Sequence, residues 1–307
     1  MATKKPKTTT KAAPKKSAAK SKTAAKTVTK PVSEAPKTNT VVEKTEKKSC
    51  FAGFFAKKYE ENESILTVFK NHKFYGALFG EFIGTALLTL LLLAMSLMGV
   101  IGVGQYAAFA LIAIFIAIYA FSGAALNPLV AVGLMATRRI SVIRGIMYIV
   151  AEVVGAWLGW LVFNSFHLAG GETAYALPAM AEVGDGQFWI FAMIELLGGI
   201  IISFFVARAL KYKKSAFTYS ATIAGGITLA IVVGYVISAA FFSAQGNFAF
   251  NPAVAMMLQI FPTAGENFGE IIGGIGQALA IYALFPMIGG AIGMYISDFA
   301  SKLSGEE

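Results

Sequence analysis

The sequence Asn127-Pro128-Leu129 opens an apolar stretch that ends near Ala136, and Asn251-Pro252-Ala253 opens a second stretch that ends near Phe261. Each stretch is about half as long as the roughly 20 apolar residues that span a membrane. Asn caps a helix by accepting a backbone N–H, and Pro suits the next position because it lacks an N–H and has a helical φ. Irregular backbone at membrane depth must be buried in protein or face a water-filled cavity. The two stretches are therefore predicted to be re-entrant half-helices.

Six longer apolar runs surround these stretches. Of the 307 residues, 56% are apolar and 14% are charged, whereas ordinary soluble domains carry about 25% charged residues. The mean hydropathy of +0.65 agrees with this and argues against a soluble domain. The runs that are long enough to span a membrane are 76–98, 103–122, 142–163, 188–210, 217–242 and 271–297. The sequence predicts an all-α membrane protein with six transmembrane helices and two half-helices.

Positive charges mark one side of this predicted membrane protein. They lie before the first span, after the second, fourth and sixth spans, and at the start of the third, as Lys70, Lys73, Arg138, Arg139, Arg144, Arg208, Lys211, Lys213, Lys214 and Lys302. The opposite loops, 99–102, 164–187 and 262–270, contain no Lys or Arg. Because positively charged loops stay in the cytoplasm, we expect a multi-pass protein of the cell membrane with both termini in the cytoplasm.

Residues 1–62 are predicted to be a disordered cytoplasmic tail rich in Lys, Ala, Thr and Pro. The first 50 residues hold 14 Lys and three Glu, a net charge of +11, while the rest of the chain has 12 basic and 14 acidic residues, a net charge of −2. Such a tail has too few apolar residues to offset the entropy of ordering. We expect it to associate with anionic inner-leaflet lipid. Nucleic acid is a less favoured partner, because no aromatic residue precedes Phe51. The remaining parts are a juxtamembrane segment (63–74), a membrane domain (75–298) and a short cytoplasmic C-terminus (299–307).

The two halves of the chain share landmarks in the same order. Each half has a Glu-x-x-Gly motif (Glu81 to Gly84, Glu195 to Gly198), then Asn-Pro, then two glycines four residues apart (Gly155 and Gly159, Gly289 and Gly293). Three spans per half is an odd number, so the halves must be inverted across the membrane. Inverted repeats are typical of transporters and channels whose site lies at the repeat interface.

The carboxylates and glycines of these landmarks have different expected roles. Glu81 and Glu195 are costly inside a membrane unless they are paired or face a cavity. We expect them to accept N–H groups from the re-entrant loops; a proton relay is the alternative, but no other titratable residue flanks them. Glu152 in the third span has no counterpart in the sixth span, and its role stays open. The four paired glycines are predicted to permit close helix packing.

These residues together resemble the major intrinsic protein family, which comprises aquaporins and glycerol facilitators. The resemblance covers about residues 75–298. It rests on Glu81-Phe-Ile-Gly84-Thr, Ser122-Gly-Ala-Ala-Leu-Asn127-Pro-Leu129, Ala136-Thr-Arg-Arg-Ile-Ser141, Asn251-Pro-Ala253 and Pro286-Met-Ile-Gly289-Gly290. It implies six spans with two half-helices, a pore in each subunit and a homotetramer. In the family, pore width, lining donors and an Arg or half-helix dipole barrier set selectivity.

Three positions depart from the family pattern. Leu129 replaces the Ala of the usual Asn-Pro-Ala, Ala125 stands where the family often has His, and Val254 stands where the family normally places Arg. By offset from Asn251, the resemblance implies that Ala239, Phe248 and Val254 belong to the selectivity filter, and the second span contributes Phe109 (or Ala107, depending on a two-residue gap). Such a filter is apolar throughout, and its small residue beside Phe resembles the glycerol-conducting branch.

The expected function is a passive channel for small uncharged solutes such as glycerol, together with water. Asn127 and Asn251 would donate N–H groups to the permeant, while the dipoles of the half-helices would repel cations. The alternatives are a water-only, gas or ion-leaky channel with an apolar filter, and a structural or tethering protein with a closed pore. We expect no enzyme activity, cofactor or metal, because the sequence has two His, one Cys and no recognisable nucleophile with its base.

Overall fold

The computed structural model describes residues 65–98, 100–171, 187–212, 215–242, 248–260 and 268–305, and the regular elements in these ranges are all helical. The predicted all-α fold class is confirmed. The expected tail over 1–62 lies outside the described residues.

The first half of the fold contains three long helices and one half-helix. Its elements are α2 (Ile65–Lys70), α3 (His72–Met98), α4 (Val100–Tyr119), α5 (Pro128–Ala136) and α6 (Val142–Ala169). The half-helix α5 begins at the first Asn-Pro, as the sequence predicts. Helix α6 continues six residues past the predicted end of the third span, so it enters a segment expected to be loop.

The second half repeats this order with a break in its last helix. Its elements are α7 (Phe188–Lys211), α8 (Ala216–Phe242), α9 (Pro252–Ala255), η2 (Met256–Ile260), α10 (Phe268–Leu279), η3 (Ala280–Leu284) and α11 (Phe285–Leu303). The expected sixth span is therefore α10, a π-helical turn and α11 in succession. Pro286 gives the physical reason, since its ring and missing N–H prevent a regular helical hydrogen bond to the preceding turn. Helix α11 also ends five residues beyond the predicted boundary at 298.

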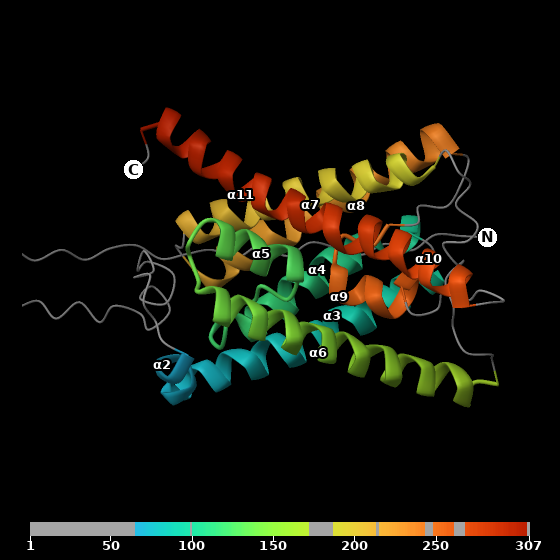
Figure 1. Ribbon diagram of the computed structural model, residues 1–307, viewed down its shortest axis with the longest axis horizontal. Helices are drawn as coiled ribbons and strands as arrows, with labels where there is room; N and C mark the ends of the chain where they lie inside the picture. The colour runs from blue at the N-terminus through green and yellow to red at the C-terminus, as the bar shows by residue number, and fades with distance from the viewer. Residues whose placement is uncertain are drawn as a thin grey trace, which may run out of the picture. The chain divides into compact units, whose positions relative to one another are not determined.

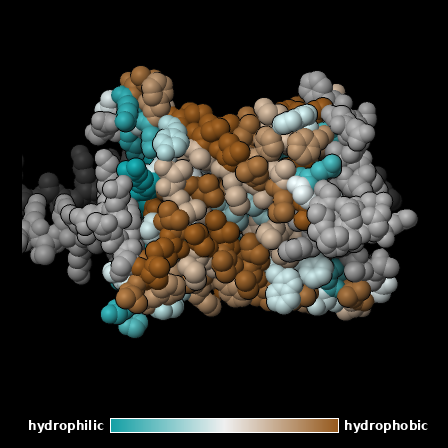
Figure 2. Space-filling view, viewed as in Figure 1, coloured by the Kyte–Doolittle hydropathy of each residue, from teal (hydrophilic) through white to brown (hydrophobic). Residues whose placement is uncertain are grey.

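Five helical segments in the described residues are long and apolar enough to cross a membrane. They are His72–Met95, Val142–Ala169, Phe188–Lys211, Ala216–Ala240 and Gly274–Leu303. The remaining expected span corresponds to α4, whose apolar part over Ala108–Tyr119 is shorter. Figure 2 shows apolar side chains across the middle of one face and polar side chains towards its ends. Val150, Val154 and Trp157 on α6 are among the large apolar residues left exposed on the surface.

The arrangement of the helices follows the internal repeat. Helix α3 packs on α6 in the first half, and α7 packs on α11 in the second, while α4 and α8 pack on each other between the halves. Each half-helix crosses to the other half: α5 packs on α11, and α9 packs on α6. In Figure 1, α5 and α9 approach from opposite ends of the bundle and meet near its middle. The repeat thus places both Asn-Pro sequences at one point.

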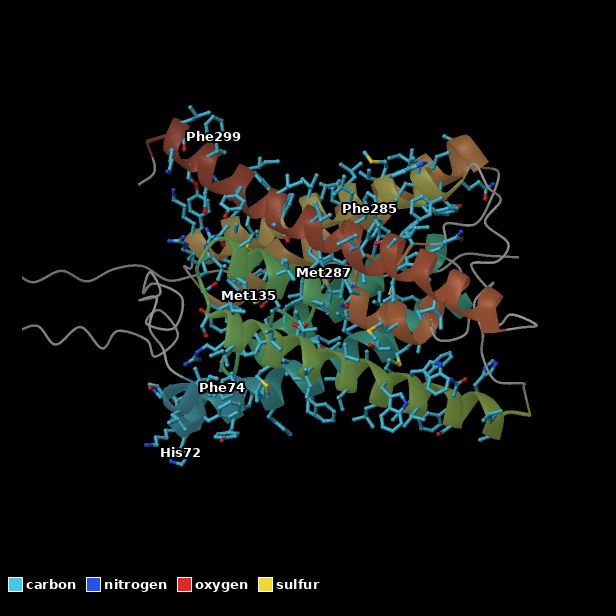
Figure 3. All side chains as sticks on the ribbon, viewed as in Figure 1. His72, Phe74, Met135, Phe285, Met287 and Phe299 are labelled. Atoms are coloured by element: carbon cyan, nitrogen blue, oxygen red, sulfur yellow. The ribbon has the colours of Figure 1, made fainter. Side chains whose placement is uncertain are left out.

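Two described basic residues outside the tail, Arg139 and Arg208, contact the C-terminal part of α11. Figure 3 places His72 and Phe74 at the start of α3 at the same end as Phe299 on α11. Arg139 forms an ion pair with Asp298 at 2.5 Å, which ties the segment after α5 to α11. The orientation predicted from charge requires such basic residues at one end of the bundle.

Candidate functional site

Both half-helices begin with the predicted cap. Asn127 has an extended backbone (φ −163°, ψ 118°), and its side-chain oxygen accepts the Leu129 N–H at 3.2 Å. Asn251 is also extended, and its side-chain oxygen accepts the N–H groups of Ala253 at 3.1 Å and Val254 at 3.4 Å. Each Asn therefore caps the N-terminus of its helix through its side-chain oxygen, which leaves the amide NH2 group available for other partners.

The two amide groups also brace the opposite half-helix. The Asn127 Nδ2 donates to the carbonyl oxygen of Phe250 at 2.8 Å, and the Asn251 Nδ2 donates to the carbonyl oxygen of Leu126 at 2.9 Å. Each acceptor is the residue just before the other Asn. An amide NH2 has two donors, so this reciprocal brace uses one and leaves one. Each amide that the sequence analysis assigned to a permeant thus has one N–H engaged between the half-helices.

The residue before each Asn has a backbone conformation that side chains rarely adopt. Leu126 and Phe250 both have φ of +48°, in the left-handed region that is costly for large residues. Close packing against one glycine holds each of them in place. A Cβ on Gly84 would lie 2.3 Å from the Leu126 side chain, and a Cβ on Gly198 would lie 2.1 Å from the Phe250 ring. The glycine of each Glu-x-x-Gly motif makes room for the strained residue.

The glutamate of each motif holds the same loop by its backbone. Glu81 accepts the N–H groups of the two residues before Asn127, at 3.1 and 2.6 Å, one on each oxygen. Glu195 accepts those of the two residues before Asn251, at 2.6 and 3.0 Å. Both glutamates are fully buried. This geometry is that of a scaffold, and throughout the described ranges no three His, Cys, Asp or Glu side chains come together as a metal site requires.

Glu152 supports the first loop as well, although the sequence offered it no role. Its Oε1 accepts the backbone N–H of Asn127 at 2.9 Å. In the sequence, Glu152 stands three residues before Gly155 and on the same face of α6. The corresponding position of the second half, three residues before Gly289, is Pro286 and not a glutamate. Comparison of the two halves therefore hid this residue. The backbone N–H groups of three consecutive residues, Ala125, Leu126 and Asn127, thus donate hydrogen bonds to two buried carboxyl groups.

The paired glycines lie where two helix backbones touch. A Cβ on Gly155 would lie 2.2 Å from the Phe82 carbonyl oxygen, and one on Gly159 would lie 2.4 Å from the Ala86 carbonyl oxygen. In the second half, a Cβ on Gly289 would lie 2.2 Å from the Leu196 carbonyl oxygen, and a Cβ on Gly293 would lie 2.2 Å from the Ile200 carbonyl oxygen. Real Cβ atoms do not approach so closely, so only glycine fits at these crossings.

The backbone of Leu129 lies against a glycine of α11. Leu129 is fully buried, and a Cβ on Gly290 would lie 2.2 Å from its carbonyl oxygen and 3.3 Å from its Cβ. The equivalent residue in the other half is Ala253, which packs on Ala156 of α6.

The four residues of the expected filter lie in different surroundings. Phe248 stacks on Phe250 with ring centroids 4.7 Å apart. Val254 is buried in an apolar cluster with Leu93, Phe163 and Leu258. Phe109 is 72% exposed, and Ala239 is exposed as well. These four residues are not gathered in one buried cluster, and the filter stays a prediction.

Comparisons with known proteins agree with this geometry. The family model described as major intrinsic protein matches residues 68–297. The chain is 28% identical to Aquaporin-1 of Bos taurus over 179 residues, which are 58% of this chain and 59% of that protein. It is 32% identical to a probable aquaporin PIP2-5 of Arabidopsis thaliana over 168 residues, 47% of this chain and 56% of that protein. The chain thus spans less than two thirds of the curated relatives it matches.

A solved structure extends the likeness to the fold. The aquaglyceroporin from Plasmodium falciparum superposes with a TM-score of 0.52 at 17% identity, covering 75% of this chain and 96% of that one. At this identity the likeness supports the fold alone. The resemblance seen in the Asn-Pro and Glu-x-x-Gly motifs is confirmed by the family match over most of the membrane domain: this chain belongs to the major intrinsic protein family.

Proposed function

We propose that this protein is a passive channel for water and small uncharged solutes of the glycerol type. The observation that carries the proposal is the reciprocal brace of Asn127 and Asn251. It holds two helix N-termini together and leaves each amide one N–H to donate. A solute with lone pairs can accept these hydrogen bonds, while the positive ends of both half-helices oppose the entry of cations.

The choice of glycerol-type solutes rests on the apolar surroundings of the outer half-helix. Phe248 and Phe250 present stacked rings beside the second Asn-Pro, and Val254 has no charge to offer. An apolar constriction suits a solute that carries both CH groups and hydroxyls better than it suits an ion. The curated relatives are named aquaporins and the structural neighbour an aquaglyceroporin, which supports water and a small polyol as the first solutes to test.

The same apolar surroundings support a second candidate function. A constriction without the usual Arg has lost one barrier to cations, and an apolar ring can dewet. A gas-permeable or ion-leaky channel is therefore the alternative. Conductance of the protein in planar bilayers identifies the ion-leaky alternative, because neither a solute channel nor a gas channel adds a steady current.

Stopped-flow light scattering of proteoliposomes with the full-length protein tests the proposed function. An impermeant osmolyte reports water flux, and a glycerol gradient reports solute entry as re-swelling. We expect both rates to exceed those of empty liposomes. Fast shrinkage without re-swelling would leave a water-only channel, and rates equal to those of empty liposomes in both runs would refute the proposal.

The place of Val254 in the filter is tested by Val254→Arg. Arg would place a bulky cation with several N–H donors at this position, as in the usual family pattern. We expect glycerol flux to fall more than water flux, since narrowing excludes the larger solute first. Water and glycerol fluxes measured on the same proteoliposomes give the ratio. A loss of equal size for both solutes would contradict the filter assignment, because it indicates general damage to the buried cluster around Val254.

Three further features complete the proposal. The basic end of the bundle faces the cytoplasm, in accord with the charge rule for loops. The chain assembles as a homotetramer in the cell membrane, as the family resemblance implies.

The Lys-rich residues 1–62 associate with anionic lipid, which predicts that vesicles containing phosphatidylserine bind this protein more tightly than neutral vesicles do.

A further inference from the structure

We propose that Glu152 positions Asn127 and that the carboxyl groups of Glu152 and Glu81 share one proton. This inference concerns the packing beneath the first half-helix and goes beyond the proposed channel function. It rests on which oxygen atoms of the two groups already accept hydrogen bonds, on their burial, and on the charged groups that the described part of the chain places around them.

The oxygen atoms of Glu81 are both occupied by donors. One accepts the Ala125 N–H at 3.1 Å and the other accepts the Leu126 N–H at 2.6 Å. The Ser122 hydroxyl also interacts with this carboxylate. A carboxyl group that only accepts hydrogen bonds is best satisfied as the anion. Glu81 therefore holds the negative charge.

Glu152 differs in one oxygen. Its Oε1 accepts the Asn127 N–H at 2.9 Å, whereas its buried Oε2 has no donor. The two carboxyl groups interact directly, and they serve consecutive residues of the same loop. A proton on Glu152 turns the unsatisfied oxygen into a donor towards the Glu81 anion. One proton thus satisfies both groups.

Within the described residues, no Lys or Arg side chain acts on Glu81 or Glu152 to replace this proton. Glu81 and Glu152 are both fully buried. Arg144 lies two turns earlier on α6, about 12 Å along the helix axis, and its guanidinium sits over the Phe74 ring at 5.5 Å. Tyr148 lies between Arg144 and Glu152 on α6, and Tyr219 of α8 faces Glu81 and donates to the Gly123 carbonyl at 2.7 Å. Two anions in contact without a cation are strongly disfavoured, so one carboxyl group keeps its proton.

The second half of the protein provides an internal contrast. Glu195 binds its loop alone, and Pro286 stands where α6 has Glu152. The first loop thus depends on two carboxyl groups that share a proton, and the second loop depends on one carboxyl group. Substitution of each glutamate by glutamine should therefore have unequal consequences.

The flux experiment compares Glu152→Leu with Glu152→Gln in full-length proteoliposomes. Leu leaves the Asn127 N–H without an acceptor, and we expect about a tenfold drop in water flux per reconstituted protein. Gln restores the acceptor and supplies an N–H to Glu81, as the protonated acid does, so flux should recover relative to Glu152→Leu. Glu81→Gln and Glu195→Gln should lower the flux, because both oxygens of each glutamate accept backbone N–H groups and the NH2 group of Gln cannot accept one. Equal losses in the Leu and Gln variants of residue 152 would overturn the proposal.

Infrared spectroscopy detects the shared proton independently of flux. The wild-type protein at neutral pH should show a protonated-carboxyl C=O band that loses the intensity of one group in Glu152→Gln. Unchanged band intensity in Glu152→Gln, or no protonated-carboxyl band in the wild type, would also overturn the proposal of a shared proton. If the wild type conducts no solute, the band and the thermal stabilities of the four variants still decide the question, so failure of the channel function remains distinct.

Discussion

Asn127→Ala is expected to abolish most of the water and solute flux of this protein and to lower its thermal stability. The substitution removes the helix cap of α5, which is worth about 1 kcal/mol. It also takes the donor away from the buried Phe250 carbonyl, which costs about 1–3 kcal/mol more. The sum of roughly 2–4 kcal/mol lowers the equilibrium constant for the braced arrangement of the two half-helices by about 30-fold or more.

Asn71→Ala is the matched control for this prediction. Asn71 also sits at a helix start, where its side-chain oxygen accepts the Lys73 N–H at 3.0 Å, but it is exposed at the end of the bundle. Its loss should cost about 1 kcal/mol or less of stability and leave flux unchanged. Stopped-flow rates and thermal unfolding in detergent give both readouts. If the two variants lose flux equally, the brace between the half-helices has no special role.

The local features of the site could be predicted from the sequence because they depend on neighbouring residues. Asn followed by Pro predicts a capped helix start, and both half-helices begin at those residues. The Glu-x-x-Gly motifs stood out because they occur in both halves. Their mechanism needed the structure, since the partner of each glycine is a residue at positive φ more than 40 positions away.

The contacts between the halves could not be read from spacing. The hydrogen bond from Asn127 to Phe250 joins residues 123 positions apart, and no periodicity reports on such a pair. Glu152 was missed for a related reason, because the search for equivalent residues discards a group that only one half has. The break at η3 had a visible cause in Pro286, but hydropathy alone averages over it and predicts one continuous span.

The second large effect is expected for Gly289→Ala. The added Cβ would lie 2.2 Å from the Leu196 carbonyl oxygen and 3.0 Å from the Ile200 backbone nitrogen. Both atoms belong to the α7 backbone, so no side-chain rotation can relieve the overlap, and α11 must move away from α7. Overpacking of this kind costs at least roughly 1–3 kcal/mol. We expect a clear fall in the unfolding temperature and in the yield of detergent-stable protein.

Gly225→Ala on α8 provides the comparison, because nothing lies within 4 Å of the added Cβ. Its stability should be unchanged or slightly raised by the higher helix propensity of Ala. A Gly289→Ala protein as stable as Gly225→Ala would mean that the two helices are not in contact at this crossing. The flux of the surviving Gly289→Ala protein should also fall, because the next residue, Gly290, lies against the Leu129 carbonyl. A shift of α11 therefore moves α5, and with it the amide of Asn127 on which the proposed channel depends.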